Sequence, residues 1–222
     1  MELDEILKKT VELTKSYQIP YAVAGGLVAS VYREEYRNTN DVDIVINPAN
    51  NALQIATDIL SALNFEVGIA RKADLQGGPM VAIKRKTTEP CMLIGRAKDN
   101  PKGPGVDILL PSIPWVPEAV RRAQNNLLDF GFGPIPAITV EDIIMAKFVS
   151  LANASGRDKD VDDLKSIFKA SKDIDLKYLI GQMTKLEVSV PPAINKNAPE
   201  ILLKVSMDIK SQEKKSKKGI ER

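Results

Sequence analysis

The sequence predicts an α/β fold followed by a helical C-terminal domain. Up to about residue 137, short apolar runs of strand length, such as residues 21–24 and 44–46, alternate with segments of helical spacing. Beyond that point the apolar residues follow helical spacing alone. We therefore expect an α/β domain over residues 1–137, a helical domain over 138–209 and a basic, disordered tail over 210–222.

The elements of the first domain follow from apolar spacing and from the residues that interrupt it. An amphipathic helix over 2–18 ends before Pro20, and a second helix, to about residue 35, follows the pair Gly25-Gly26. A third helix begins near Pro48. The remaining apolar runs are separated by turn residues at 76–79 and 100–105, and predict strands at 21–24, 44–46, 65–69, 80–83, 92–94 and 106–110.

The second domain is predicted from helical spacing and from start and stop signals. A Gly/Pro-rich connection at 130–136 leads into it. Thr139, with Asp142 three residues on, is a variant N-cap signal, and Ser155-Gly156 marks the end of the helix that follows. A predicted helix at 118–126 still belongs to the first domain. The predicted helices of the second domain lie at 140–151, from 157 onward, near 175–183 and near 199–208.

The composition narrows the chemistry open to this chain. Its 222 residues include one cysteine, Cys91, and no histidine. Histidine-dependent triads, Cys-His dyads and zinc sites with histidine ligands are therefore excluded. Any metal site has to be built from carboxylates, which favours Mg²⁺ or Mn²⁺.

Hydropathy and cysteine usage indicate where the protein works. No apolar run approaches the ~20 residues that cross a bilayer, so we expect no membrane contact. The acidic start at residues 1–4 lacks the apolar core of a signal peptide. A single cysteine agrees with a reducing compartment, and we expect a cytoplasmic protein.

The charge is unevenly distributed. The formal net charge is +2, yet residues 210–222 hold six basic and two acidic residues, which leaves the rest of the chain at −2. A slightly acidic body is not typical of a broad nucleic-acid surface. The tail is either a solubilising extension, which is the more ordinary interpretation, or an arm that contacts RNA.

The most informative stretch is residues 24–46, which opens with Gly25-Gly26 and ends in a strand headed by Asp41 and Asp43. Strand side chains alternate between faces, so both carboxylates point the same way. A cation such as Mg²⁺ removes their repulsion where phosphates supply further ligands. The glycines lack a Cβ, so a phosphate can approach the backbone closely. Taken singly, a Gly pair is usually a tight turn and Asp-x-Asp a solvated strand edge.

Together these residues resemble the signature of the nucleotidyltransferase superfamily: Gly25-Gly26, a helix, Arg37-Asn38-Thr39-Asn40 and Asp41-Val42-Asp43-Ile44. The resemblance implies a small mixed sheet of the nucleotidyltransferase type and a third carboxylate on a neighbouring strand, for which Asp107 is the candidate. The Arg-x-Thr-x-Asp arrangement is closest to the AbiEii-like, small-molecule-type branch. The gap of 14 residues between Gly26 and Asp41 is long for the superfamily but suits this branch.

The resemblance further implies Mg²⁺- or Mn²⁺-dependent transfer of an NMP from an NTP such as ATP to an acceptor hydroxyl, with release of pyrophosphate. Asp41, Asp43 and Asp107 would be both catalytic and metal-binding. A mixed-charge helix start such as that at residue 157 is ordinarily a capped, solvated face. The residues implied in nucleotide contact are Gly25, Gly26, Arg37, Thr39, Lys147, Arg157, Lys159 and Asp160, the last with a structural or catalytic role.

Two other functions stay open. One is a catalytically inactive module of the same fold that binds a nucleotide or a partner; the presence of all three carboxylates argues against it. The other is a toxin-type nucleotidyltransferase that acts on tRNA or protein, with the same chemistry and a different acceptor. The acceptor, whether small molecule, RNA or protein, is not identified, because acceptor pockets are built from variable loops such as residues 71–78.

Overall fold

The computed structural model describes residues 2–71, 89–154 and 156–220. Within them the chain forms two compact units. The first takes in the described residues from 2 to 139 apart from 32–35, and the second takes in 32–35 and the described residues from 140 on. Three predicted features lie outside the described residues: the turn at 76–79, the strand at 80–83 and all but the first residue of the loop at 71–78.

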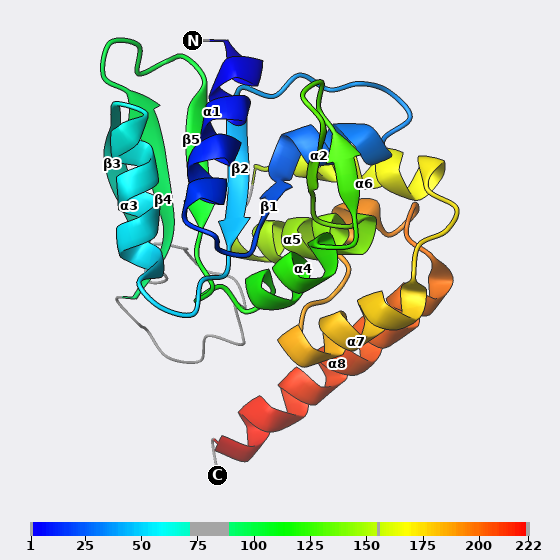
Figure 1. Ribbon diagram of the computed structural model, residues 1–222. Coiled ribbons are helices and arrows are strands. Elements are labelled where there is room, and N and C mark those ends of the chain that lie inside the picture. Colours follow the sequence, from blue (N-terminus) through cyan, green and yellow to red (C-terminus); the bar gives the residue numbers. More distant parts are fainter. Residues whose placement is uncertain (1, 72–88, 155, 221–222) are drawn as a thin grey trace. The chain divides into compact units, whose positions relative to one another are not determined.

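The first unit is built on a mixed β-sheet (Figure 1). Its strands are β1 (Tyr21–Ala24), β2 (Asp41–Ile46), β3 (Phe65–Arg71), β4 (Pro90–Ala97) and β5 (Gly105–Leu109). In the part of the chain that the structure describes, their order across the sheet is β1-β2-β5-β4-β3. The central pair, β2 and β5, is parallel, whereas the other neighbouring pairs are antiparallel.

Alternating burial divides the sheet into two faces. Val42 in β2 and Val106 in β5 are fully buried, whereas the residues on either side of Val42 are partly exposed. Helices α1 (Leu3–Ser16) and α3 (Ala52–Ala62) lie side by side over the buried face (Figure 1). Gly95 of β4 shows how closely α3 packs, because a Cβ there would lie 2.6 Å from a leucine methyl carbon of that helix. The opposite face carries the side chains of Asp41, Asp43 and Asp107.

The connection predicted at 130–136 is in fact a β-hairpin. It pairs β6 (Leu127–Asp129) with β7 (Pro134–Pro136). The Asp129 side chain accepts hydrogen bonds from the backbone N–H groups of Gly131 and Gly133, at 2.8 and 3.0 Å. Both glycines have positive φ, a conformation that other residues rarely adopt. The Gly and Pro content that predicted an irregular connection therefore builds a turn that is capped by a side chain.

Two further helices begin in the first unit. Helix α2 (Gly25–Tyr32) follows β1, and helix α4 (Val116–Ala123) follows β5.

The second unit is helical. Apolar side chains from each of its longer helices, including Phe148, Leu164, Met183 and Leu202, are fully buried. The α/β class followed by helices, as expected from the sequence, is confirmed. The elements are α5 (Val140–Asn153), α6 (Asp158–Ala170), α7 (Leu176–Leu186), a 3₁₀ turn (Pro192–Ile194) and α8 (Glu200–Ile220).

Helix α8 differs from the expectation for the C-terminal segment. It continues to Ile220, through most of the segment that we expected to be disordered from residue 210. The low apolar content that predicted disorder is compatible with a helix, because Lys, Glu and Gln are good helix formers. Among the residues described, no helix combines the length and the apolar character needed to cross a membrane.

Candidate functional site

The three predicted carboxylates lie on one face of the first unit's sheet. Asp43 in β2 is in register with Asp107 in β5, and Asp41 is in register with Gly105. Because residues in register point to the same side, and Asp41 lies two residues before Asp43, the three side chains share a face. This is the face opposite α1 and α3. The sheet order therefore brings Asp107 next to a pair that lies more than sixty residues earlier in the chain.

Gly25 closes the site from the side of β1. It has φ of 63°, and a Cβ added there would overlap the Asp43 carboxyl group. The α-carbon of Gly25 thus lies directly against that carboxylate, and both the backbone angle and the space require glycine. Gly25 is also the first residue of α2. The turn predicted as a phosphate cradle and the predicted carboxylate pair are therefore adjacent.

Gly26 packs against the other two predicted residues of this stretch. A Cβ there would lie 2.5 Å from Arg37 Nη2 and 2.7 Å from Thr39 Oγ1. The Ser30 hydroxyl is 2.9 Å from the Gly26 carbonyl oxygen and 3.0 Å from the Arg37 carbonyl oxygen. It therefore fixes the segment before β2 to the first turn of α2. Gly25, Gly26, Arg37 and Thr39 are brought together with Asp43.

A residue that the sequence analysis missed, Arg96, lies among the carboxylates. Its Nη1 donates a hydrogen bond to Asp107 Oδ1 at 2.8 Å, and its Nη2 lies 3.5 Å from Asp41 Oδ1. Arg96 is on the same face of β4 because that strand extends to Ala97, beyond the predicted end at residue 94. Alternation along a longer strand was the one signal that could have placed it there.

The pKa values reflect this arrangement. Burial raises the pKa of Asp107, as does the nearby charge of Asp41, and the hydrogen bond and charge of Arg96 offset this only in part. For Arg96, partial burial on its own would lower the pKa. The hydrogen bond to Asp107 and the charges of Asp107, Asp41 and Asp43 outweigh burial and raise it. The site is therefore a coupled set of opposite charges.

The donor set fits a divalent cation in its chemistry. Carboxylate oxygens on one face, with a bare backbone beside them, are the ligands that Mg²⁺ and Mn²⁺ prefer together with phosphates. Within the described part of the chain, no three His, Cys, Asp or Glu side chains gather closely enough to form a metal-binding group. Asp41 and Asp43 are the pair that would hold the cation, while Asp107 is turned to Arg96.

The remaining predicted residues belong to the second unit, where an ion network surrounds Lys147. Its Nζ donates hydrogen bonds to Asp160 Oδ1 at 2.8 Å and to Asp163 Oδ2 at 2.5 Å. The Lys147 side chain is only 7% exposed and that of Asp163 is 0% exposed. Arg33 forms a further ion pair with Asp163, and Arg157 pairs with Asp160. Lysine and arginine charges that we expected to meet a triphosphate are thus engaged by aspartates.

Asp160 and Lys159 differ in their surroundings. Burial acts to raise the pKa of Asp160, but the charges and hydrogen bonds of Lys147 and Arg157 outweigh it, so the pKa is lowered. Lys159, the residue before it, is exposed. Asp163 and Arg33, which are not among the predicted nucleotide-contact residues, complete the network. Their contact, 130 positions apart in the chain, has no signal in sequence spacing.

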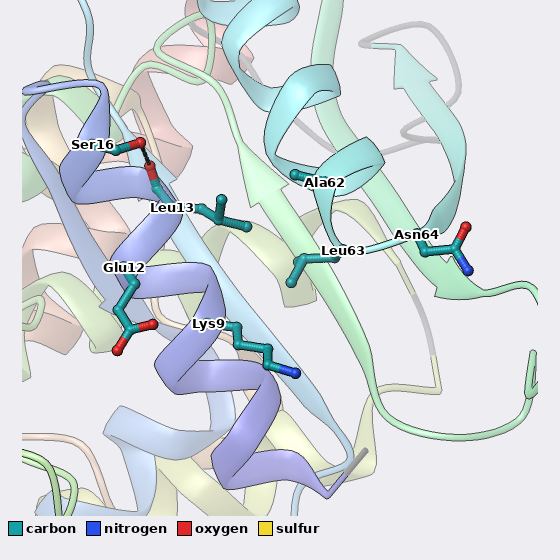
Figure 2. A pocket seen from close by; sticks show the side chains of 7 residues that line it. All are labelled: Lys9, Glu12, Leu13, Ser16, Ala62, Leu63 and Asn64. Carbon is teal, nitrogen blue, oxygen red and sulfur yellow. Dashed lines mark hydrogen bonds between the residues drawn. The ribbon is translucent and has the colours of Figure 1, made fainter.

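A cavity of about 440 Å³ lies elsewhere in the first unit (Figure 2). It opens between α1 and the C-terminal end of α3. None of the predicted site residues lines it, and its walls are a mixture of alkyl groups and solvated polar side chains. The lining residues are Lys9, Glu12, Leu13, Ser16, Ala62, Leu63 and Asn64.

Comparison with known proteins finds only distant likeness. No protein-family model and no curated protein matches this chain. Among solved structures, it is similar to an antigenic nucleotidyltransferase-like protein from Paracoccidioides brasiliensis, with 20% identity, a TM-score of 0.45, and coverage of 95% of this chain and 88% of that one. It is also similar to the antibiotic-resistance factor ANT(2'')-Ia, with 13% identity, a TM-score of 0.48, and coverage of 98% and 96%. At these TM-scores neither likeness assigns an activity to this chain.

Proposed function

We propose that this chain is a nucleotidyltransferase of the AbiEii-like, small-molecule-type branch, which moves an NMP from an NTP to an acceptor hydroxyl. The observation that carries the proposal is the carboxylate face, where Asp41, Asp43 and Asp107 lie on one side of two parallel strands beside the bare backbone of Gly25. An all-oxygen set of this kind suits Mg²⁺ or Mn²⁺ where phosphates complete the coordination.

Each carboxylate has a distinct proposed role. Asp41 and Asp43 hold the divalent cation, which when bound neutralises and orients the triphosphate. Asp107, whose pKa is raised by burial, accepts the proton of the acceptor hydroxyl while the hydroxyl oxygen bonds to the α-phosphorus. The bond from the α-phosphorus to its bridging oxygen breaks, and pyrophosphate leaves with that electron pair.

The residues around Gly25 supply the proposed nucleotide contacts. Without a Cβ, Gly25 and Gly26 allow a phosphate to approach the backbone, and Arg37 and Thr39 lie against Gly26 where they can donate hydrogen bonds. Nucleotide contact by four residues of the second unit stays a prediction of the sequence resemblance: Lys147, Arg157, Lys159 and Asp160.

One observation favours a second function, a nucleotide- or partner-binding module without activity. Arg96 already supplies positive charge to Asp41 and Asp107, as in a carboxylate site that no longer needs a cation. The two functions differ in whether pyrophosphate is released. A binding module binds NTP without breaking the bond between the α-phosphorus and its bridging oxygen.

The test is incubation with each of the four NTPs labelled on the α-phosphate, with Mg²⁺ or Mn²⁺, and with tRNA, protein and small hydroxyl compounds as acceptors. We expect labelled product and pyrophosphate from wild type and none from Asp43→Asn. Asp99→Asn is the matched control, because Asp99 is an exposed aspartate of the same unit, and it should behave as wild type. Nucleotide binding without label transfer to any acceptor would instead support the binding module.

A further inference from the structure

On the carboxylate face, the Arg96 side chain extends from its own strand across the neighbouring strand to Asp41. It belongs to β4, whereas Asp107 lies on β5 and Asp41 lies on β2, beyond β5 in the sheet. Nη1 donates hydrogen bonds to Asp107 Oδ1 and to the Gly95 carbonyl oxygen, both at 2.8 Å. Nη2 faces Asp41 Oδ1 at 3.5 Å. One guanidinium thus connects two of the three carboxylates.

Gly105 makes this reach possible. It is in register with Asp41 and lies between β4 and β2. A Cβ on Gly105 would overlap Arg96 Nη1 and would lie 2.7 Å from Arg96 Cζ. The guanidinium therefore lies directly over the Gly105 backbone. Any larger residue at this position would separate the guanidinium from Asp41.

The position that Arg96 takes is also the position that a cation would need. A divalent ion held by Asp41 and Asp43 must take the Asp41 carboxylate oxygen that now faces the guanidinium. A cation bound to the same Asp41 carboxylate as the guanidinium would be repelled by it. The ion therefore cannot bind while Arg96 keeps its present position. The Arg96 side chain is 31% exposed and that of Asp41 is 41% exposed, so the pair can separate without opening a buried core.

We propose that Arg96, anchored on Asp107, is an internal counter-ion that competes with the divalent cation for Asp41 and so sets the cation affinity of the site. This inference rests on the proposed function, because it takes the carboxylate face to be a cation site. Arg96 keeps the carboxylates together in the metal-free protein, and it weakens cation binding by the free energy needed to displace the guanidinium.

The experiment measures Mn²⁺ binding without nucleotide, by the EPR signal of free Mn²⁺, for wild type and Arg96→Gln. We expect Arg96→Gln to bind Mn²⁺ about tenfold more tightly or better, a change of ~1.4 kcal/mol. Arg96→Lys should fall between the two, since a lysine ammonium is a point charge without the planar fork. The matched control is Arg121→Gln, because the Arg121 side chain is 68% exposed and pairs with Glu118 of the same helix, α4, and its Mn²⁺ affinity should equal that of wild type.

Thermal unfolding of the same proteins provides a second readout. Without cation, Arg96→Gln should be less stable than wild type because its carboxylates repel, and Mn²⁺ should stabilise it more than it stabilises wild type. If Arg96→Gln does not fold without cation, Arg96→Lys gives the comparison.

The outcomes separate this inference from the proposed function. Equal or weaker Mn²⁺ binding by Arg96→Gln, with clear binding by wild type, overturns the counter-ion role and leaves the cation site in place. Absence of Mn²⁺ binding in wild type and in both Arg96 variants overturns the cation site and the inference together. Tighter binding that is lost again in Arg96→Gln/Asp41→Asn supports the inference and locates the ion.

Discussion

Two groups of aspartates with basic partners differ sharply in their surroundings. On the carboxylate face of the first unit, Asp41 and its partner Arg96 remain open to solvent. In the second unit, the Lys147 side chain is almost fully buried and that of Asp163 fully buried, and one hydrogen bond of 2.5 Å joins them. A buried charge has lost its hydration and depends on its partner, whereas a solvated one can exchange its partner for an ion. We therefore expect the first group to exchange Arg96 for a bound ion and the second to act as a structural network.

The largest effect on stability should come from Asp163→Asn. This change leaves Lys147 and Arg33 buried without their shared carboxylate, which costs about 3–5 kcal/mol for a buried pair. Urea unfolding measures it. Asp162→Asn is the control, because Asp162 also pairs with Arg33 but its side chain is 65% exposed, and it should cost about 1 kcal/mol at most. Equal losses of stability in the two variants would show that burial does not decide how much these ion pairs contribute.

Lys147 and Lys159 should separate in the same way. Lys147→Ala removes the buried cation between Asp160 and Asp163, and we expect a loss of several kcal/mol, about that of a broken buried pair. Lys159→Ala changes an exposed side chain, so its free energy of unfolding should stay within about 0.5 kcal/mol of wild type. If Lys147→Ala were as stable as wild type but bound NTP more weakly, Lys147 would be a nucleotide contact and not part of a structural network.

Asp160 gives the network a pH dependence of known sign. Its pKa is lowered in the folded protein, so it binds fewer protons there than in the unfolded chain. Its contribution is complete above the unfolded value of about 3.9 and is lost as pH falls through the lower folded value. We therefore expect the stability difference between wild type and Asp160→Asn to be largest near neutral pH and to shrink in acid. A difference that grows on acidification would show that the ion pairs do not stabilise Asp160.

A small effect on stability should also come from Asp41→Asn. Its ion pair with Arg96 is long and solvated, and such pairs are worth about 0–1 kcal/mol. Thermal or urea unfolding should therefore resemble that of wild type, while nucleotidyl transfer is abolished, since a neutral amide holds Mg²⁺ poorly. A loss of stability as large as that of Asp163→Asn would mean that the carboxylate face is a structural network too.

Local pattern was sufficient to predict part of the site. Strand alternation places Asp41 and Asp43 on one face, and β2 begins at Asp41 as that pattern requires. Gly25-Gly26 was recognised from its position after a short apolar run, and Gly25 does adopt a positive φ. These features depend on neighbours within a few residues, so they can be read from the chain itself.

Spacing alone could not predict long-range contacts, and the position of Asp107 beside Asp43 was expected only from the family resemblance. Arg96 reaches Asp41 only because β5 separates their strands and presents Gly105 there, and sheet order is not encoded in spacing. Arg33 and Asp163 meet although they lie 130 positions apart in the chain. At the C-terminus, the low apolar content predicted disorder, whereas the helix propensity of the Lys, Glu and Gln residues favours the observed continuation of α8 to Ile220.

The central claim is that the carboxylate face of β2 and β5 transfers a nucleotidyl group, and Asp107→Ala tests it most directly. Asp41 and Asp43 remain in this variant, so it should bind Mg²⁺-NTP with near-normal affinity. Its transfer rate, with the acceptor that wild type uses, should fall about a hundredfold or more, the contribution expected of an acid-base group. Transfer by Asp107→Ala at the wild-type rate, or NTP binding by wild type without transfer to any acceptor, would contradict the claim.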